Sequence, residues 1–191
     1  MTDRKGKLIV FSAPSGAGKT TIVKALLTRI PELEFSVSAC SRPMREGEVH
    51  SKDYYFLSAE EFRQKIQREE FLEWEEVYDD RFYGTLKTEL QRIWDKNHHV
   101  LFDVDVKGGI NIKQQYPANT LSVFVMPPSL EVLSERLINR GTEVETELKK
   151  RLGKAEFEMT FAPQFDLQII NDDLESAINQ AEKEVRRFIS R

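Results

Sequence analysis

The chain has 191 residues, of which 40% are apolar and 31% are charged, and its formal net charge is −4 at pH 7. These values are typical of one globular domain, or of a core with small inserted parts, and the negative charge argues against a nucleic acid as main partner. No apolar run is long enough to cross a membrane, and the single cysteine, Cys40, excludes an internal disulfide. No signal peptide precedes the first predicted strand, so we expect a cytoplasmic protein without a membrane partner.

A strand, a glycine-rich turn and a helix follow one another around the segment Leu8–Thr21, which reads LIVFSAPSGAGKTT. The apolar run Leu8–Phe11 predicts a strand buried on both faces, and apolar residues recur at helical spacing in Thr21–Ile30. This order is the context of a phosphate-binding loop, whose backbone N–H groups and helix N-terminus attract anions. Lys19 can reach the outer phosphates of a nucleotide, and the Thr20 hydroxyl can ligate Mg²⁺.

The loop departs from the pattern G-x-x-x-x-G-K-[ST] at its first position, where this chain has Ala13 instead of glycine. Alanine fits there only if its backbone φ angle is negative, because a Cβ atom disfavours positive φ. Gly16 and Gly18 remain for the tight part of the turn. The segment therefore predicts a site for nucleotide phosphate but does not indicate the reaction.

The block from about residue 37 to residue 88 is rich in short strands and aromatic residues. Its predicted elements are a strand at Phe35–Ser41, a turn with Arg42 and Arg45, a strand at Asp53–Leu57, a helix from the capping box Ser58–Glu61, a strand at Phe71–Tyr78, and the segment Phe82–Thr85. A helix through Leu90, Ile93 and Trp94 follows. Because this block differs from the α/β rhythm around it, we interpret it as an inserted subdomain.

Strands and helices alternate in the second half of the chain. The predicted elements are a strand at His99–Asp105, a helix at about Gly109–Tyr116, a strand at Leu121–Val125, a helix capped by Ser129 and ended by Gly141, a charged helical segment from Thr142 to about Phe161, a strand at Leu167–Ile170 and a helix at Leu174–Ile189. This alternation predicts an α/β fold with a parallel sheet and helices on both faces. Ligands of such sheets bind at the carboxyl ends of the strands, where Lys19, Asp103 and Asp105 fall.

Two carboxylates and two arginines are candidates for phosphate chemistry. Asp103 and Asp105 lie two residues apart at the end of a predicted strand, so both point the same way, and Asp103 is the candidate that holds Mg²⁺ directly or through water. Arg42 and Arg45 flank the rigid Pro43, and two guanidinium groups on such a turn can clamp a phosphate. The alternatives are carboxylates that cap the next helix and arginines that are solvated on the surface.

Other charged residues leave more than one interpretation open. Arg136 and Arg140 share a helix face, and Arg151 lies in the next charged segment; a lid over a transferring phosphate needs arginines, but charged helices carry them anyway. Glu73 stands in an aromatic stretch and can accept hydrogen bonds from the N–H groups of a ligand. Asp105–Gly108 matches the D-x-x-G motif of signalling GTPases, but the N-K-x-D motif of those proteins does not occur in the chain.

The ordered set of motifs resembles that of the guanylate kinase family over essentially the whole chain, from Lys7 to Ile189. The matching segments are SAPSGAGKTT, S-x-x-x-R-P-x-R-x-G-E with D-Y-Y-F, E-F-L-E-W, F-Y-G-T, D-V-D-x-K-G, R-G-T-E, K-R-L and I-N-D-D. The resemblance implies a P-loop core with a parallel sheet, a GMP-binding α+β insert at 37–88 and a short helical lid at 141–158. It further implies that the chain transfers the γ-phosphate of ATP to GMP, with Mg²⁺ as cofactor.

The resemblance also implies roles for individual residues. ATP would be bound by the phosphate loop and by one residue near the adenine: Ala13, Pro14, Ser15, Gly16, Ala17, Gly18, Lys19, Thr20, Thr21 and Asn171. The GMP phosphate would be held by Arg42, Arg45, Tyr54 and Tyr83, and the guanine would be contacted by Ser38, Glu73, Thr85 and Asp105. The catalytic set around the transferring phosphate would be Lys19, Arg42, Arg140 and Arg151. Thr20 and Asp103 would hold the metal.

The residues can support this chemistry. The phosphate of GMP is largely ionised at neutral pH, because its second pKa is about 6, so charge neutralisation and alignment suffice without a general base. A carboxylate at Glu73 suits guanine, whose N1–H and amine both donate hydrogen bonds. Cys40 stands where the family often has threonine, and it offers weaker hydrogen bonds.

Two other classes of protein remain as alternatives. One is a kinase for another nucleotide, against which Glu73, Ser38 and Thr85 argue. The other is a non-catalytic guanylate-kinase-like interaction module, which typically lacks an intact phosphate loop. The expected partners are ATP and GMP, and the sequence leaves a homo-oligomer open.

Overall fold

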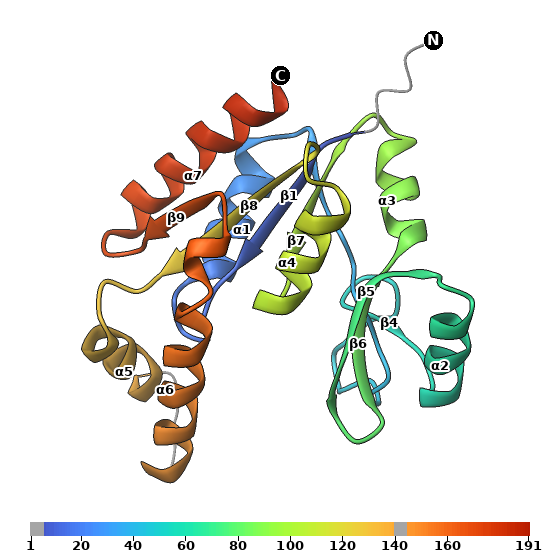
Figure 1. Ribbon diagram of the computed structural model, residues 1–191, viewed down its shortest axis with the longest axis horizontal. Coiled ribbons are helices and arrows are strands. Elements are labelled where there is room, and N and C mark those ends of the chain that lie inside the picture. Colours follow the sequence, from blue (N-terminus) through green and yellow to red (C-terminus); the bar gives the residue numbers. More distant parts are fainter. Residues whose placement is uncertain (1–5, 140–144) are drawn as a thin grey trace.

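The computed structural model describes residues 6–139 and 145–191, and its centre is a five-stranded parallel sheet. In spatial order the strands are β2 (Leu33–Phe35), β7 (His99–Asp103), β1 (Leu8–Ser12), β8 (Thr120–Met126) and β9 (Leu167–Ile170). The helices that cover the sheet are α1 (Lys19–Arg29), α3 (Lys87–Trp94), α4 (Val106–Gln115) and α7 (Leu174–Ile189). The predicted α/β fold with a parallel sheet is therefore confirmed (Figure 1).

The strand β1 is buried on both faces, as its apolar run predicts. Its alternate residues Ile9 and Phe11 pack into the cluster that includes α1 and α7, whereas Leu8 and Val10 pack into the cluster that includes α3 and α4. Because successive side chains of a strand point to opposite faces, this division places one pair of helices on each face of the sheet. The carboxyl end of β1 leads directly into the glycine-rich loop.

A second sheet of four strands stands apart from the central one. Its order is β4 (Tyr55–Phe56), β3 (Ala39–Cys40), β6 (Arg81–Leu86) and β5 (Phe71–Tyr78), and helix α2 (Ala59–Gln67) packs on it. The predicted capping box of Ser58 and Glu61 begins α2. The ring of Phe62 stacks on those of Phe71 and Phe82, with centroids 4.2 and 5.3 Å away, so this sheet has a small aromatic core of its own.

The remaining helices form a pair beside the central sheet. They are α5 (Leu130–Ile138) and α6 (Glu145–Met159), which share a cluster of Leu133, Leu137 and Ala155, and a 3₁₀ turn at Ala162–Gln164 follows. The predicted end of the first helix at Gly141 lies outside the described residues. The α5–α6 pair and the second sheet lie on opposite sides of the molecule (Figure 1). Within the described ranges, no helix is long and apolar enough to cross a membrane.

Two of the predicted strands have wrong boundaries. The expected strand at Phe35–Ser41 is divided, because Phe35 ends β2 in the central sheet whereas Ala39 and Cys40 pair in the second sheet. The strand expected over Asp53–Leu57 is reduced to β4. Both errors arise where the chain passes from one sheet to the other, since alternation of side chains says nothing about which sheet a strand joins.

Two helices begin earlier than their sequence suggests. Asp105 is not part of strand β7 but the N-cap of α4, because its carboxylate accepts a hydrogen bond from the Gly108 N–H at 2.7 Å, so α4 begins at Val106 and not at Gly109. Helix α1 begins at Lys19 rather than Thr21. The predicted alternative of a helix-capping carboxylate therefore holds for Asp105.

Candidate active site

The glycine-rich loop joins β1 to α1 at the carboxyl edge of the central sheet. Gly16 and Gly18 have φ angles of 95° and 94°, which favour glycine. A Cβ atom on Gly18 would also lie 2.2 Å from Nδ2 of Asn171, so this position has no room for a side chain. The described non-glycine residues with positive φ do not include Ala13, so the departure at that position fits the loop without strain.

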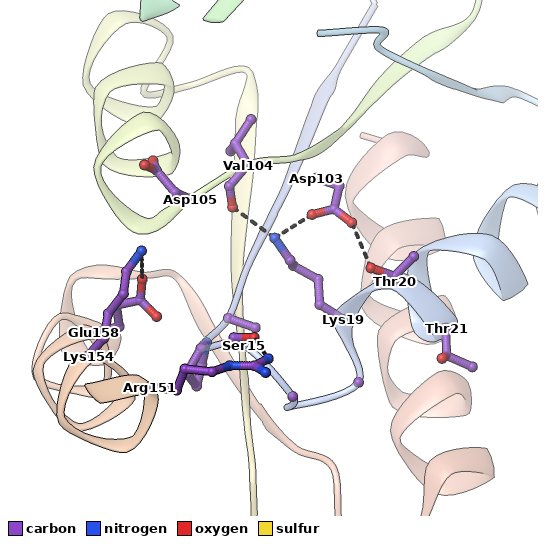
Figure 2. A pocket seen from close by; sticks show the side chains of 14 residues that line it. Ser15, Lys19, Thr20, Thr21, Asp103, Val104, Asp105, Arg151, Lys154 and Glu158 are labelled. Carbon is purple, nitrogen blue, oxygen red and sulfur yellow. Dashed lines mark hydrogen bonds and ion pairs between the residues drawn. The ribbon is translucent and has the colours of Figure 1, made fainter. Parts of the chain in front are cut away.

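The side chains of Lys19, Thr20 and Asp103 meet beside the loop (Figure 2). The Lys19 ammonium pairs with the Asp103 carboxylate and donates to the Val104 carbonyl oxygen at 3.1 Å. The Thr20 hydroxyl donates to the other oxygen of Asp103 at 3.3 Å. Mg²⁺ usually takes one or two protein oxygens together with waters and phosphate oxygens. Thr20 and Asp103 fit that demand, and the described residues contain no cluster of three or more metal-ligating side chains.

A first cavity of about 370 Å³ opens over the loop. It is lined by Ala13, Pro14, Ser15, Gly16, Gly18, Lys19, Thr20, Thr21, Asp103, Val104, Asp105, Arg151, Lys154 and Glu158. The Arg151 guanidinium donates to the Ser15 hydroxyl at 2.8 Å, which ties α6 to the loop (Figure 2). The structure thus brings the predicted loop residues, Asp103 and Arg151 to one place.

Asn171 lies behind the loop and not in the cavity wall. Its side chain is buried, and Nδ2 donates to the Ala17 carbonyl oxygen at 2.7 Å. Arg136 donates to the Asn171 carbonyl oxygen at 2.9 Å. These hydrogen bonds stabilise the conformation of the phosphate loop, which Asn171 contacts from behind and not from the cavity.

A second cavity of about 240 Å³ adjoins the first. It is lined by Ser38, Tyr54, Glu73, Glu75, Val77, Tyr83, Gly84, Asp103, Val104, Asp105 and Lys154, of which the last residues Asp103, Val104, Asp105 and Lys154 also line the first cavity. Segments of both sheets therefore meet here. Five of the eight residues predicted to bind GMP line this cavity: Ser38, Tyr54, Glu73, Tyr83 and Asp105.

Glu73 is a half-buried carboxylate in the wall of the second cavity. It accepts a hydrogen bond from the buried Thr85 hydroxyl at 2.7 Å. Burial raises the pKa of Glu73 to about 7. A Cβ atom on Gly108 would lie 2.9 Å from the Glu73 carboxylate, so a glycine at this point of α4 leaves the space that the carboxylate occupies. Thr85 therefore acts on this cavity through Glu73.

Two further carboxylates lie beside Glu73. Burial, together with the nearby Glu75 carboxylate, raises the pKa of Asp105. Lys107 donates to Glu75 at 2.8 Å. The side of the second cavity next to α4 is therefore acidic, which favours a ligand that donates hydrogen bonds.

Arg42 is buried behind the cavity and does not line it. Both of its terminal amino groups donate to Glu48, at 2.7 and 2.5 Å, and its guanidinium lies over the ring of Tyr54 at 5.0 Å. The Arg42 hydrogen bonds lower the pKa of Glu48 to about 2. Arg45 is exposed, and its backbone N–H also donates to Glu48, at 2.7 Å. Glu48 thus occupies the Arg42 guanidinium and the Arg45 backbone N–H, which are two of the anion-binding groups of this turn.

Sequence reasoning missed four charged residues at or beside the site: Glu48, Glu75, Lys154 and Glu158. Lys154 and Glu158 follow Arg151 at spacings of three and seven, and they pair with each other at 3.7 Å (Figure 2). That spacing places all three residues on one helix face, and this pattern is the signal in the sequence from which Lys154 and Glu158 could have been predicted. Arg140, one of the predicted catalytic residues, lies outside the described residues.

Comparison with known proteins assigns the chain to a family. The model of the family described as guanylate kinase matches residues 5–188. A guanylate kinase of Bacteroides thetaiotaomicron is 53% identical over 97% of this chain and 91% of its own length, and one of Porphyromonas gingivalis is 48% identical over 97% and 99%. The crystal structure of a guanylate kinase from Anaplasma phagocytophilum is similar with a TM-score of 0.76 and 30% identity, covering 97% of this chain and 87% of that one. The chain belongs to the guanylate kinase family.

Proposed function

We propose that the protein is a guanylate kinase, which transfers the γ-phosphate of ATP to GMP and so forms ADP and GDP. The observation that carries this proposal is the meeting of two cavities at Asp103–Asp105. One is built on the phosphate loop with Lys19, and the other contains the half-buried carboxylate Glu73. Two adjoining sites of this kind suit a donor and an acceptor nucleotide whose phosphates must touch.

ATP would occupy the first cavity. The loop N–H groups and the N-terminus of α1 would bind its β- and γ-phosphates, and Lys19 would leave Asp103 to neutralise them. Thr20 and Asp103 would hold Mg²⁺, which supplies charge neutralisation at the transferring phosphate. Arg151 would exchange Ser15 for a phosphate oxygen, since its guanidinium already lies at the loop. Arg140 is proposed for the same phosphate on the family resemblance alone.

GMP would occupy the second cavity. The N1–H and the exocyclic amine of guanine would donate to the ionised Glu73, while Ser38 and Asp105 would contact the other polar groups of the base. Thr85 would hold Glu73 in place. Adenine offers an acceptor where guanine has N1–H, so AMP would leave the charge of Glu73 unpaired in the closed site. Such a mismatch lowers kcat/KM for the wrong substrate by roughly 10⁴-fold.

The GMP phosphate would be bound by Arg42, Arg45, Tyr54 and Tyr83. In this arrangement it would compete with Glu48 for Arg42, because a phosphate offers the same pair of acceptor oxygens as a carboxylate. The acceptor oxygen of GMP needs no base, so the protein contributes alignment and positive charge. We further propose three functional parts: a core, a GMP-binding insert at 37–88 and a lid at 141–158.

A coupled assay of ADP release with each of the four nucleoside monophosphates tests the proposal. We expect GMP to be the preferred acceptor by at least about 10³-fold in kcat/KM and activity to require Mg²⁺. Preference for another monophosphate would assign a different acceptor, and absence of turnover with all four would favour a non-catalytic interaction module.

A further inference from the structure

Glu89 is a buried carboxylate that the proposed reaction does not use. It lies in the first turn of α3, directly after the chain returns from the second sheet, and it is 1% exposed. A buried carboxylate is costly unless its oxygens are fully hydrogen-bonded. Its partners therefore indicate what it is for.

Glu89 accepts four hydrogen bonds, which fill the acceptor sites of a carboxylate. Two come from Arg92 on the same helix, at 2.8 and 2.9 Å. One comes from the backbone N–H of Val37, at 2.9 Å, and one from the hydroxyl of Tyr55, at 2.6 Å. Despite the burial, these hydrogen bonds keep the pKa of Glu89 below its ordinary value.

Glu89 and its partner Val37 lie on the two chain segments that connect the sheets. Val37 lies between β2 of the central sheet and β3 of the second sheet, and Glu89 itself lies just after β6. Tyr55 belongs to β4. One carboxylate thus ties the outgoing chain, the returning chain and a strand of the second sheet to helix α3.

The same partners are adjacent to residues of the second cavity. Val37 precedes Ser38, and Tyr55 follows Tyr54; both neighbours line the cavity. The Tyr55 N–H also donates to the Ser38 carbonyl oxygen at 2.9 Å. A shift at Tyr55 is therefore transmitted along the backbone to two residues of the proposed GMP site.

The outer part of this ion network has no such connection. Glu34 pairs with Arg92, and it accepts hydrogen bonds from Lys96 at 2.8 and 3.1 Å. These groups belong to β2, to α3 and to the turn after it, all on the side of the central sheet. Glu34 therefore provides a matched control: it shares the network with Glu89, but no hydrogen bond of its side chain in the described structure reaches the second sheet.

We propose that Glu89 is a positioning residue for the GMP site. By holding Val37, Tyr55 and Arg92 together, it fixes the chain segments around β3 and β4 beside α3 and keeps Ser38 and Tyr54 where GMP binds. The inference rests on the proposed function, because it assigns the second cavity to GMP. It predicts that loosening the tie weakens GMP binding and leaves ATP binding unchanged.

Steady-state kinetics of three variants test the inference. Tyr55→Phe removes one hydrogen-bond donor to Glu89 and keeps the carboxylate, and Glu89→Gln removes the charge. We expect KM for GMP to rise about threefold to tenfold in Tyr55→Phe and about tenfold or more in Glu89→Gln, with KM for ATP within about twofold of the parent value. Glu34→Gln should lower the melting temperature without raising KM for GMP. Calorimetric titration with GMP should show the same order of affinities.

Two results would overturn the positioning role. One is a rise in KM for GMP in Tyr55→Phe and Glu89→Gln no larger than in Glu34→Gln, and the other is a parallel rise in both Michaelis constants. If Glu89→Gln fails to fold, Tyr55→Phe decides, because that variant keeps the carboxylate and all its other partners. Failure of the unmodified protein to phosphorylate GMP would instead refute the proposed function, so the two failures are distinct.

Discussion

Lys19 is the residue on which phosphate transfer depends most directly. It is placed at the phosphate loop, where its charge is now balanced by Asp103. We expect Lys19→Ala to lower kcat by about 10³-fold or more, because this charge stabilises the transition state of transfer. Kinetics with circular dichroism measure the effect. Lys24→Ala, an exposed lysine of the same helix, is the control, and a folded Lys19→Ala enzyme within tenfold of the parent would refute the role.

Glu73 makes GMP recognition depend on pH. Its two oxygens can accept hydrogen bonds from both the N1–H and the amine of guanine only when the carboxylate is ionised, and burial raises the pKa of Glu73 to about 7. We expect kcat/KM for GMP to fall about tenfold per unit as pH decreases below 7. The GMP phosphate also titrates near 6, so Glu73→Gln is measured alongside. The pH dependence lost in that variant belongs to Glu73, and equal profiles for both proteins would contradict this assignment.

The same raised pKa affects the stability of the protein in the opposite direction. The folded protein binds the Glu73 proton more tightly than the unfolded chain, whose glutamate titrates near 4.5. The contribution of this group is therefore fully present below pH 4.5 and is lost as pH rises to about 7. We expect Glu73→Gln to melt at a higher temperature than the parent protein at pH 8 and at a similar temperature at pH 4. A lower melting temperature of the variant at pH 8 would refute the burial effect.

At the scale of single elements, two glycines have different structural reasons: one is required by a positive φ angle, and the other only lowers the stability of a helix. Gly18→Ala forces a Cβ atom into a positive-φ position against Asn171, and we expect a loss of about 2–3 kcal/mol in the free energy of unfolding. Gly153 lies in the exposed face of α6 with no atom within 4 Å of an added Cβ, so Gly153→Ala should gain about 0.5–1 kcal/mol. Urea denaturation measures both. Equal effects of the two substitutions would contradict the role of the loop geometry.

The elements that periodicity predicted best are one edge strand of each sheet and the C-terminal helix. β5, β9 and α7 have the boundaries that their patterns predict. The boundaries failed at Phe35–Ser41, where the chain changes sheet, and at Asp105, where a side chain caps a helix instead of extending a strand. Local pattern does not encode such tertiary choices.

The site shows the same limit. Motif spacing predicted Lys19, Thr20 and Asp103, because the loop and the strand end are defined by neighbours in sequence. Glu89 belongs to no motif. Its proposed role depends on hydrogen bonds with Tyr55 and Val37, which lie 34 and 52 positions before it in the chain. Lys154 was detectable from its helical spacing, but only once the position of Arg151 at the loop was known.

At the scale of the whole molecule, the donor and acceptor sites belong to different parts of the structure. The phosphate loop belongs to the core, while the turn with Arg42 and Arg45 belongs to the second sheet and lines neither cavity. We expect Arg42→Ala and Arg45→Ala to raise KM for GMP about tenfold or more and KM for ATP much less. Equal effects on both substrates would move these arginines to the transferring phosphate, and no effect would leave Arg42 with only its structural pairing to Glu48 and Arg45 without a ligand role.

Transfer requires these separate parts to converge, so we expect the molecule to close on its substrates. Arg42 is held by Glu48 and Arg151 by Ser15, which means that both arginines must exchange an internal partner for a phosphate. In-line transfer also demands that the two phosphates approach within a few ångströms while water is excluded. Because GMP contacts are proposed on the second sheet and ATP contacts on the core, binding of both ligands favours the state in which these parts are drawn together.

Small-angle scattering measures this closure. We expect the radius of gyration to decrease when GMP and a non-hydrolysable ATP analogue are both present, and to decrease less with either ligand alone. Glu48→Gln, which frees Arg42 from its internal charge partner, should bind GMP more tightly, because the phosphate no longer competes with a carboxylate. If calorimetry shows saturation by both ligands while the radius of gyration stays constant, the site is preformed, and the exchange of partners at Arg42 and Arg151 takes place without movement of the second sheet.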